Sequence, residues 1–142
     1  MIKQLSVFVE NKRGALVETT SILAQKQINI RAMALADTTK YGVLRMIVDD
    51  LPAAQVALQA SGFLTKETAV VAVRMPDRSG ALYDVVQCLA QIGEELEYLY
   101  AFNRGSQNSA YVVLRVQDVA KSEQALAAAG YTLFSEDDLA NL

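Results

Sequence analysis

The chain of 142 residues contains no histidine, no tryptophan and a single cysteine, Cys88. Without histidine it cannot form a Ser-His-Asp or Cys-His catalytic arrangement, an imidazole general base or a histidine-ligated metal site. A single cysteine excludes an internal disulfide and every CxxC redox or zinc motif. Since no pair of carboxylates at a defined spacing takes their place, we expect no catalytic residue, no metal site and no cofactor, and therefore no enzyme.

Charge and long apolar runs are also scarce. Charged residues make up 20% of the chain, with 13 basic against 16 acidic side chains. The isoelectric point of about 4.9 argues against binding the phosphate backbone of nucleic acids. The longest apolar run, at 68–75 with Arg74 inside it, is far shorter than the roughly 20 residues of a membrane span. Residues 1–6 contain no apolar signal segment. We therefore expect a cytoplasmic protein with no nucleic-acid partner and no membrane association.

What the chain does contain is an internal repeat. Gly14-Ala15-Leu16 recurs 66 residues later as Gly80-Ala81-Leu82, and Leu23-Ala24-Gln25 recurs at the same offset as Leu89-Ala90-Gln91. Self-similarity at a fixed offset indicates a duplicated structural unit.

Later matches in the repeat have an offset of 68, as between Gly62-Phe63 and Gly130-Tyr131. The matches keep their order, so two residues are inserted between the two blocks, and we place them in the turn at 103–108. We therefore expect two copies of one unit, the first domain at 1–66 and the second at 67–142.

Both copies predict the same order of elements. The alternation of Leu5, Val7 and Val9 with polar residues indicates a half-buried strand. A turn and a helix follow, then a strand, a hairpin, a third strand, a second helix and a fourth strand. This βαββαβ order is the ferredoxin-like split unit. Strands are expected at 28–36, 41–48 and 63–66 in the first copy, and at 70–75, 96–102, 110–116 and 131–134 in the second.

The first helix of each copy has an apolar face in its sequence. In the first copy the spacing i, i+4, i+7, i+8 predicts burial of Leu16, Thr20, Leu23 and Ala24. In the second copy the same spacing predicts burial of Leu82, Val86, Leu89 and Ala90.

The candidate binding chemistry lies in the turn before each first helix, at 11–16 and at 77–82. Unpaired N–H groups and the positive end of the helix dipole favour an anion there, and glycine allows close approach of the backbone. The carboxylate of a free amino acid fits, with an oxygen acceptor nearby for its ammonium group. The alternative is ordinary helix capping, because Asn or Asp followed by Gly is common in turns.

Other functions of this fold find less support. RNA recognition needs aromatic side chains on the central strands, and the predicted third strands offer only Tyr111, at a strand start. A copper chaperone needs a CxxC motif, and the spacing of the turns differs from that of an acyl-phosphate hydrolase.

The two turns also resemble a known family. Asp77-Arg78-Ser79-Gly80-Ala81-Leu82 is similar to the D-R-P-G-x-L turn of ACT domains, which are small amino-acid-sensing regulatory modules. Asn11-Lys12-Arg13-Gly14-Ala15-Leu16 is similar to the N-x-x-G-x-L form of that turn, and Ile28-Asn29-Ile30 resembles the start of the family's second strand. The resemblance covers both repeats, so the chain resembles a free-standing tandem ACT-domain protein.

The resemblance implies a fold and a site. The fold is α+β, with the antiparallel sheets of two ferredoxin-like units joined side by side into one eight-stranded sheet that has helices on one face. Ligands of the family are held at the seam, between the first turn of one unit and the second-strand start of the other. The ligand-binding residues implied here are Asn11, Arg13, Gly14, Ala15, Leu16, Asn29, Ile30, Asp77, Ser79, Gly80, Ala81, Leu82 and Glu95.

The second copy departs from the family pattern. Glu95 stands where the first copy has Asn29, and it can accept hydrogen bonds from an ammonium group but cannot donate one to a carboxylate. Ser79 replaces the usual proline. We therefore expect two unequal sites. The one that pairs 77–82 with Asn29 is family-like, and the one that pairs 11–16 with Glu95 favours a cationic or amino-rich ligand.

These observations predict a non-enzymatic regulator that binds a free amino acid at the seam and passes a change of shape or assembly to a partner enzyme or regulator. The alternative is an oligomerisation or interaction module without a ligand. Tyr98 and Tyr100 share a strand face, and we expect Val112 and Leu114 to lie with them on the uncovered side of the sheet. Such a face would serve either as a homodimer interface or as ordinary core.

Overall fold

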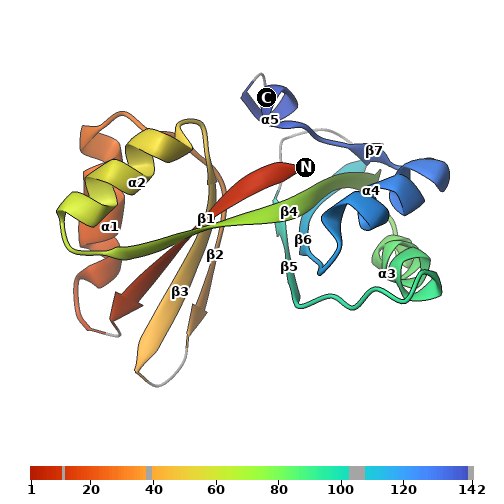
Figure 1. Cartoon of the computed structure of the whole chain (residues 1–142), viewed down its shortest axis with the longest axis horizontal. Coiled ribbons are helices and arrows are strands. Elements are labelled where there is room, and N and C mark those ends of the chain that lie inside the picture. The colour runs from red at the N-terminus through yellow and green to blue at the C-terminus, as the bar shows by residue number, and fades with distance from the viewer. Residues whose placement is uncertain (11, 38–39, 103–107, 141–142) are drawn as a thin grey trace. The chain divides into compact units, whose positions relative to one another are not determined.

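A computed structural model describes residues 1–10, 12–37, 40–102 and 108–140. The chain divides into two compact units (Figure 1). The N-terminal unit comprises Lys3–Thr68, and the C-terminal unit comprises Ala69–Leu142 together with Met1–Ile2. Each unit has its own sheet, helices and hydrophobic core.

The N-terminal unit is a four-stranded antiparallel sheet in the order β2-β3-β1-β4, with α1 and α2 on one face (Figure 1). Leu5 of β1 lies opposite Met46 of β3, and Ile30 of β2 lies opposite Val48 of β3. Its elements are β1 (Ile2–Glu10), α1 (Ala15–Gln25), β2 (Ile30–Asp37), β3 (Tyr41–Val48), α2 (Leu51–Ala60) and the first part of β4 (Leu64–Pro76).

The core of this unit follows from the alternation seen in the sequence. Leu5, Val7 and Val9 point to the helix side of the sheet and form one buried cluster with Leu23 of α1 and Leu58 of α2. The strand predicted from this alternation is thereby confirmed, but it is not half-buried. Gln4 and Ser6 on its other face are buried as well, and Gln4 Nε2 donates to Ser6 Oγ at 3.1 Å.

The C-terminal unit repeats the arrangement in the order β5-β6-β4-β7. Val71 of β4 lies opposite Leu114 of β6, and Val73 lies opposite Leu133 of β7. The helices α3 and α4 cover one face of this sheet (Figure 1). The further elements are α3 (Ala81–Gln91), β5 (Tyr98–Phe102), β6 (Ser109–Arg115), α4 (Val119–Ala128), β7 (Thr132–Leu133) and α5 (Glu136–Ala140).

The predicted fold class, α+β with two ferredoxin-like βαββαβ units, is confirmed. One element differs. The strands expected at 63–66 and 70–75 form a single strand of 13 residues, β4, so the described part of the chain has seven strands instead of eight. The intervening Glu67-Thr68-Ala69 contains neither glycine nor proline, and nothing in it ends a strand. The expected domain boundary after residue 66 falls inside β4 and stays a prediction, as does the side-by-side joining of the sheets.

The buried face of α1 differs from the expectation. The structure buries Ala15, Thr19 and Leu23, whereas Leu16 is exposed, Thr20 is half-exposed and Ala24 is exposed. Thr19 can lie in the core because its hydroxyl donates to the Ala15 carbonyl oxygen at 2.9 Å, which satisfies the polar group within the helix.

The same rotation by one residue occurs in α3, which buries Ala81, Val85 and Leu89. Leu82 and Val86, expected in the core, are 38% and 36% exposed. Both stripes satisfy the helical period. The sequence favours the stripe that carries the larger side chains Leu82 and Val86. The structure instead buries the stripe that begins with Ala81, whose small side chain fits where the helix begins against the sheet.

The expected open face of the second sheet was also assigned incorrectly. Val112 and Leu114 belong to the core between the sheet and its helices. The register places Tyr100 opposite Val113 and Tyr98 opposite Arg115, so these residues share the other face. Side chains along a strand point alternately to the two faces of the sheet. A shift of one residue in the assumed pairing of β5 with β6 therefore puts Val112 and Leu114 on the wrong face.

Candidate functional site

The helices α1 and α3 both begin at a glycine in the left-handed conformation. Gly14 has φ +87° and Gly80 has φ +85°, a region that other residues enter only with strain. A Cβ atom at Gly14 would meet no atom within 4 Å, so the turn needs glycine for its backbone angle and not for lack of space.

The second helix of each unit begins differently. Asp50 Oδ1 accepts a hydrogen bond from the Ala53 amide at 3.0 Å at the start of α2. Asp118 Oδ1 accepts one from the Lys121 amide at 3.0 Å at the start of α4. Side-chain capping is therefore used at α2 and α4, whereas among the described residues no side chain caps α1 or α3.

At the C-terminal turn, this contrast argues against the alternative that Asp77 serves only to cap the helix. The Asp77 amide donates to the Asn108 carbonyl oxygen at 3.0 Å, and Asp77 does not cap α3. In the described part of the chain the amides of Leu82 and Tyr83 have no hydrogen-bond acceptor. Two N–H groups at the positive end of α3 are thus available to an anion. At the other turn, Asn11 lies outside the described residues.

The two turns are held in different ways. Arg78 Nη2 forms an ion pair with Asp84 Oδ2 at 2.6 Å, and Arg78 Nη1 donates to the Ser79 carbonyl oxygen at 3.1 Å. The C-terminal turn is thereby tied to the first turn of α3. At the equivalent place in the N-terminal unit, Lys12 pairs instead with Glu10 at 3.5 Å, and the adjacent Arg13 is exposed.

The starts of the second strands also differ. In the N-terminal unit the Asn29 amide donates to Asp49 Oδ1 at 2.9 Å, which leaves the exposed side chain available. Ile30 packs against the core. In the C-terminal unit Glu94 Oε2 accepts from the amides of Gln117 and Asp118, both at 3.2 Å. The neighbouring Glu95 is exposed.

Within one unit, the first turn and the second-strand start do not meet. In the N-terminal unit Glu10 lies opposite Tyr41, while Ile30 lies opposite Val48. Val48 lies seven steps along β3 from Tyr41, which is about 23 Å at the rise of a strand. No single unit can therefore bring Gly14 and Asn29 to one ligand. A site that combines the two kinds of residue needs two units, and that pairing stays a prediction.

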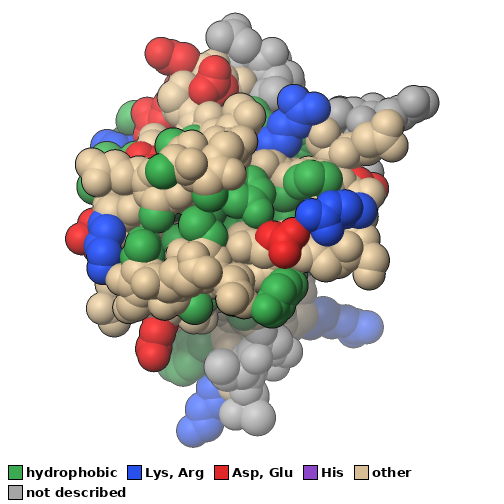
Figure 2. All heavy atoms as spheres, turned by 90° about the vertical axis from the view of Figure 1, so that its right-hand side faces the viewer, with side chains coloured by type: hydrophobic (Ala, Val, Ile, Leu, Met, Phe, Trp, Pro, Cys, Tyr) green, Lys and Arg blue, Asp and Glu red, His purple; other side chains and the backbone are tan. Residues whose placement is uncertain are grey.

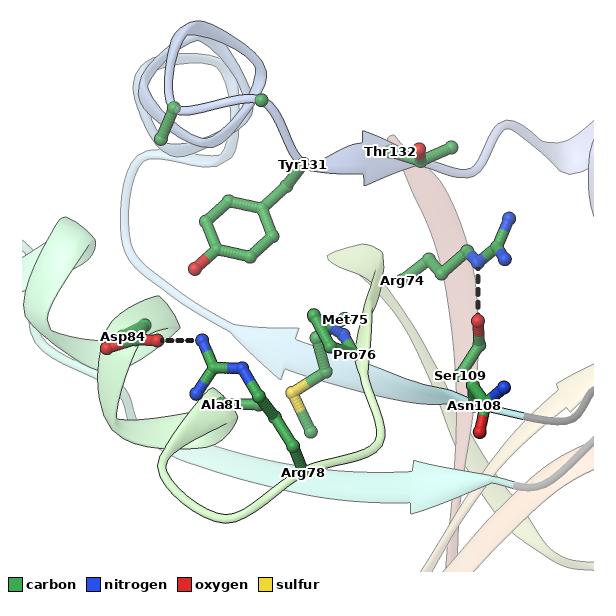
Figure 3. Close-up of a pocket in the computed structure, with 12 residues that line it drawn as sticks. Arg74, Met75, Pro76, Arg78, Ala81, Asp84, Asn108, Ser109, Tyr131 and Thr132 are labelled. Carbon is green, nitrogen blue, oxygen red and sulfur yellow. Dashed lines mark hydrogen bonds and ion pairs between the residues drawn. The ribbon is translucent and has the colours of Figure 1, made fainter.

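The C-terminal unit has a pocket beside its first turn, with a cavity volume of about 450 Å³ (Figure 3). It lies between the end of β4, the start of α3 and the turn from α4 into β7. Ala81, predicted as a site residue, lines it, together with Arg78 and three residues that the sequence did not single out: Arg74, Asp84 and Tyr131. Comparison of the two repeats could have pointed to two of these residues. Arg74 and Tyr131 carry polar groups at positions where the first repeat has Phe8 and Phe63.

The phenol of Tyr131 points toward the Arg78–Asp84 pair (Figure 3). Burial raises the pKa of Tyr131 above its ordinary value, the charges of Asp84 and Cys88 raise it further, and the guanidinium of Arg78 lowers it. The hydroxyl therefore stays protonated at neutral pH. It has no hydrogen-bond partner among the residues that the structure describes.

The described residues contain no group of three or more His, Cys, Asp or Glu side chains that could hold a metal ion. None of the helices described has the length and apolar character needed to cross a membrane.

Two βαββαβ units, each with a first helix that starts at a left-handed glycine, place the chain in the class of paired ACT-type domains. A family model described as an ACT domain pair matches residues 1–142. The chain belongs to the ACT domain pair family, which confirms the resemblance seen in the sequence.

Solved structures agree with this assignment. Protein BT0572 from Bacteroides thetaiotaomicron is 38% identical, with 99% of this chain and 96% of that chain covered and a TM-score of 0.92. The ligand-free regulatory subunit of aspartate kinase from Thermus thermophilus shares the fold at 15% identity, with 90% and 89% covered and a TM-score of 0.68. The corresponding subunit from Thermus flavus is 16% identical, with 90% of each chain covered and a TM-score of 0.65. Among curated proteins, none matches this sequence.

Proposed function

We propose that this protein is a non-enzymatic regulator that binds a free amino acid at the seam between its two ACT units. The observation that supports this most directly is the difference between helix starts within each unit. The amides of Leu82 and Tyr83 at α3 have no acceptor among the described residues, whereas α4 is capped by Asp118. A carboxylate is the natural acceptor for such amides.

The second half of the site would come from the second-strand start of the other unit. The exposed Asn29 side chain can both accept from an ammonium group and donate to a carboxylate, whereas Glu95 can only accept when ionised. The site formed by the C-terminal turn and Asn29 is therefore the stronger candidate, and the site formed by the N-terminal turn and Glu95 the altered one.

The regulatory part of the proposal rests on the family and on the fold. The same fold occurs in the aspartate kinase regulatory subunits of two Thermus species. We expect the ligand to shift an equilibrium between two conformations or two assembly states. The size of the shift is set by the difference between the ligand's affinities for the two states. The partner would be an enzyme or regulator in the cytoplasm, and the protein would act as a homodimer without nucleic acid or membrane.

An interaction module without a ligand is the second candidate. On α3, Leu82, Tyr83 and Val86 are 38%, 65% and 36% exposed, which is an apolar stripe on the outside of the C-terminal unit. Figure 2 looks onto the side of this unit that carries α3 and α4, and hydrophobic side chains gather near the centre of that view. A surface of this kind is typical of a contact with another protein.

The deciding experiment measures thermal unfolding in the presence of each of the twenty amino acids at millimolar concentration. A ligand at 100 times its dissociation constant adds about 2.7 kcal/mol to the folded state, which raises the melting temperature by several degrees. The matched controls for any hit are its amide, which lacks the carboxylate, and its N-acetyl derivative, which lacks the ammonium group.

The proposal predicts a selective rise for one or two amino acids and none for either control compound. A rise that persists with the amide would contradict carboxylate binding at the helix start. If no amino acid raises the melting temperature, the interaction module is favoured, and sedimentation of wild type against Tyr83→Ser then tests the α3 stripe.

A further inference from the structure

The pocket beside the C-terminal turn is formed by one unit alone and has its own chemistry (Figure 3). Met75 and Ala81 give it an apolar floor. The guanidinium of Arg78, the carboxylate of Asp84 and the hydroxyl of Tyr131 converge at one end of it. Arg74 lines the opposite side, where its Nε donates to Ser109 Oγ at 2.9 Å.

The balance of charge favours an anion. Two arginine side chains and one aspartate line the pocket, so one positive charge remains, in a chain whose net charge is −3. The start of α3 adds the positive end of its dipole, because Ala81 is the first residue of that helix. A small anion would therefore be attracted here and repelled by the molecule as a whole.

The Arg78–Asp84 contact shows that this guanidinium can hold a carboxylate at 2.6 Å. The two side chains are 57% and 42% exposed, so their attraction is screened by water and contributes little to stability. Another carboxylate could replace that of Asp84 at small cost. Tyr131 would add a donor, because its hydroxyl is protonated and without a partner among the described residues.

The other repeat lacks this set of groups. The positions equivalent to Arg74 and Tyr131 hold Phe8 and Phe63, and Phe63 packs against the core. Lys12, the equivalent of Arg78, pairs with Glu10 instead. The arrangement is thus particular to the C-terminal unit and does not follow from the shared fold.

We propose that this pocket binds a small carboxylate that carries a short apolar tail. The carboxylate replaces that of Asp84 on Arg78 and accepts a hydrogen bond from the Tyr131 hydroxyl. The tail lies against Met75 and Ala81. This inference does not rest on the proposed function, since the pocket needs no residue of the other unit and no ammonium group on the ligand.

Three probes with the same short tail separate the possible head groups: butyrate, butylamine and butyramide. Each is titrated into the full chain, and the amide signals of Ala81 and Tyr131 are followed by nuclear magnetic resonance. The expected result is saturable shifts with butyrate and none with butylamine. Binding of butylamine or butyramide as tight as that of butyrate would overturn the proposal, as would the absence of butyrate binding.

Two pairs of variants then locate the site. Tyr131→Phe removes one donor and should weaken butyrate binding about fivefold, whereas the control Tyr41→Phe removes a hydroxyl in the N-terminal unit and should change nothing. Asp84→Asn removes the competing carboxylate and should strengthen butyrate binding, with Glu18→Gln as its control at the equivalent position of the first repeat. Unchanged affinity in Tyr131→Phe, or weaker binding in Asp84→Asn, contradicts the assignment.

The two proposals can fail separately. An amino acid whose affinity is unchanged in Tyr131→Phe supports the seam site without the pocket. Butyrate binding in a protein that responds to no amino acid supports the pocket without the seam site.

Discussion

Gly14 and Gly80 stand 66 residues apart and begin α1 and α3 with nearly the same backbone, at φ +87° and +85°. Neither helix has a side-chain cap among the described residues, although α2 and α4 are each capped by an aspartate. The duplication has therefore kept the left-handed glycine at the start of the first helix in both units. That shared feature is the basis of the first prediction.

Replacing Gly80 by alanine should remove the amino-acid response. The control is Gly62→Ala, because Gly62 has φ +87° and lies in open space in the N-terminal unit. Each change places an L residue in the left-handed region and should lower the free energy of unfolding by about 1 kcal/mol, as urea denaturation measures. Only Gly80→Ala also places a methyl group at the start of α3. If Gly62→Ala loses the thermal shift equally, the helix start is not part of the site.

Asn29→Ala and Glu95→Ala should have unequal effects on one ligand. Asn29 can donate to a carboxylate and ionised Glu95 cannot, so Asn29→Ala should weaken binding of the stabilising amino acid, by about five- to tenfold for one lost hydrogen bond. Glu95→Ala should leave that affinity nearly unchanged. Titration calorimetry measures both dissociation constants, and equal losses would contradict the asymmetry of the two sites.

The rotated faces of α1 and α3 predict which leucines matter for stability. Leu89→Ala and Leu23→Ala leave a cavity in a core and should lower the free energy of unfolding by about 2–5 kcal/mol. The neighbouring exposed residues provide the comparison. Leu82→Ala and Leu16→Ala should cost under about 1 kcal/mol. Urea unfolding curves of the four variants decide the matter, and a large loss in Leu82→Ala would restore the face expected from the sequence.

The start of α5 should respond to acid. The backbone amide of Ser135 and then its hydroxyl donate to Asp138 Oδ2, at 2.7 and 2.8 Å, and these bonds lower the pKa of Asp138 below its usual 3.8. Because this pKa is lowered, the ionised side chain of Asp138 stabilises the folded state fully above pH 3.8. That stabilisation is lost as the pH falls through the lower pKa of the folded state.

Carbonyl chemical shifts of Asp138, followed against pH, measure that pKa directly. Ser135→Ala removes the side-chain bond and should move the pKa upward toward 3.8, while the backbone bond keeps part of the effect. Ser106→Ala is the control for a serine that is distant in sequence. No change in the pKa of Asp138 after Ser135→Ala would show that the hydroxyl bond is absent in solution.

The elements of this fold could be read from local patterns because each depends on neighbouring residues. The range 41–48 was predicted as a strand, and β3 is Tyr41–Val48. Local patterns could not decide whether two neighbouring strand segments are separate. The ranges 63–66 and 70–75 each predict a strand, and only the pairing with other strands shows that β4 runs through both.

The candidate site divides in the same way. The two glycine turns and Asn29 were visible in the sequence because the duplication repeats the turn and the departure at Glu95 interrupts the pattern. Asp84 and Tyr131 were not visible as a pair, because 47 residues separate them and their approach depends on how α3 and the turn after α4 pack on one sheet.

The sequence by itself determined that the chain is two copies of a βαββαβ unit, because the periods of strands and helices and the turn glycines are local properties. The tertiary structure decided which stripe of α1 and α3 is buried. It also decided which face of the second sheet carries Tyr98 and Tyr100, and which charged groups meet beside the C-terminal turn. The physical reason is that a period of 3.6 or 2 fixes only which residues lie together on a face. Which face is buried depends on the fit of side chains from segments far apart in the chain.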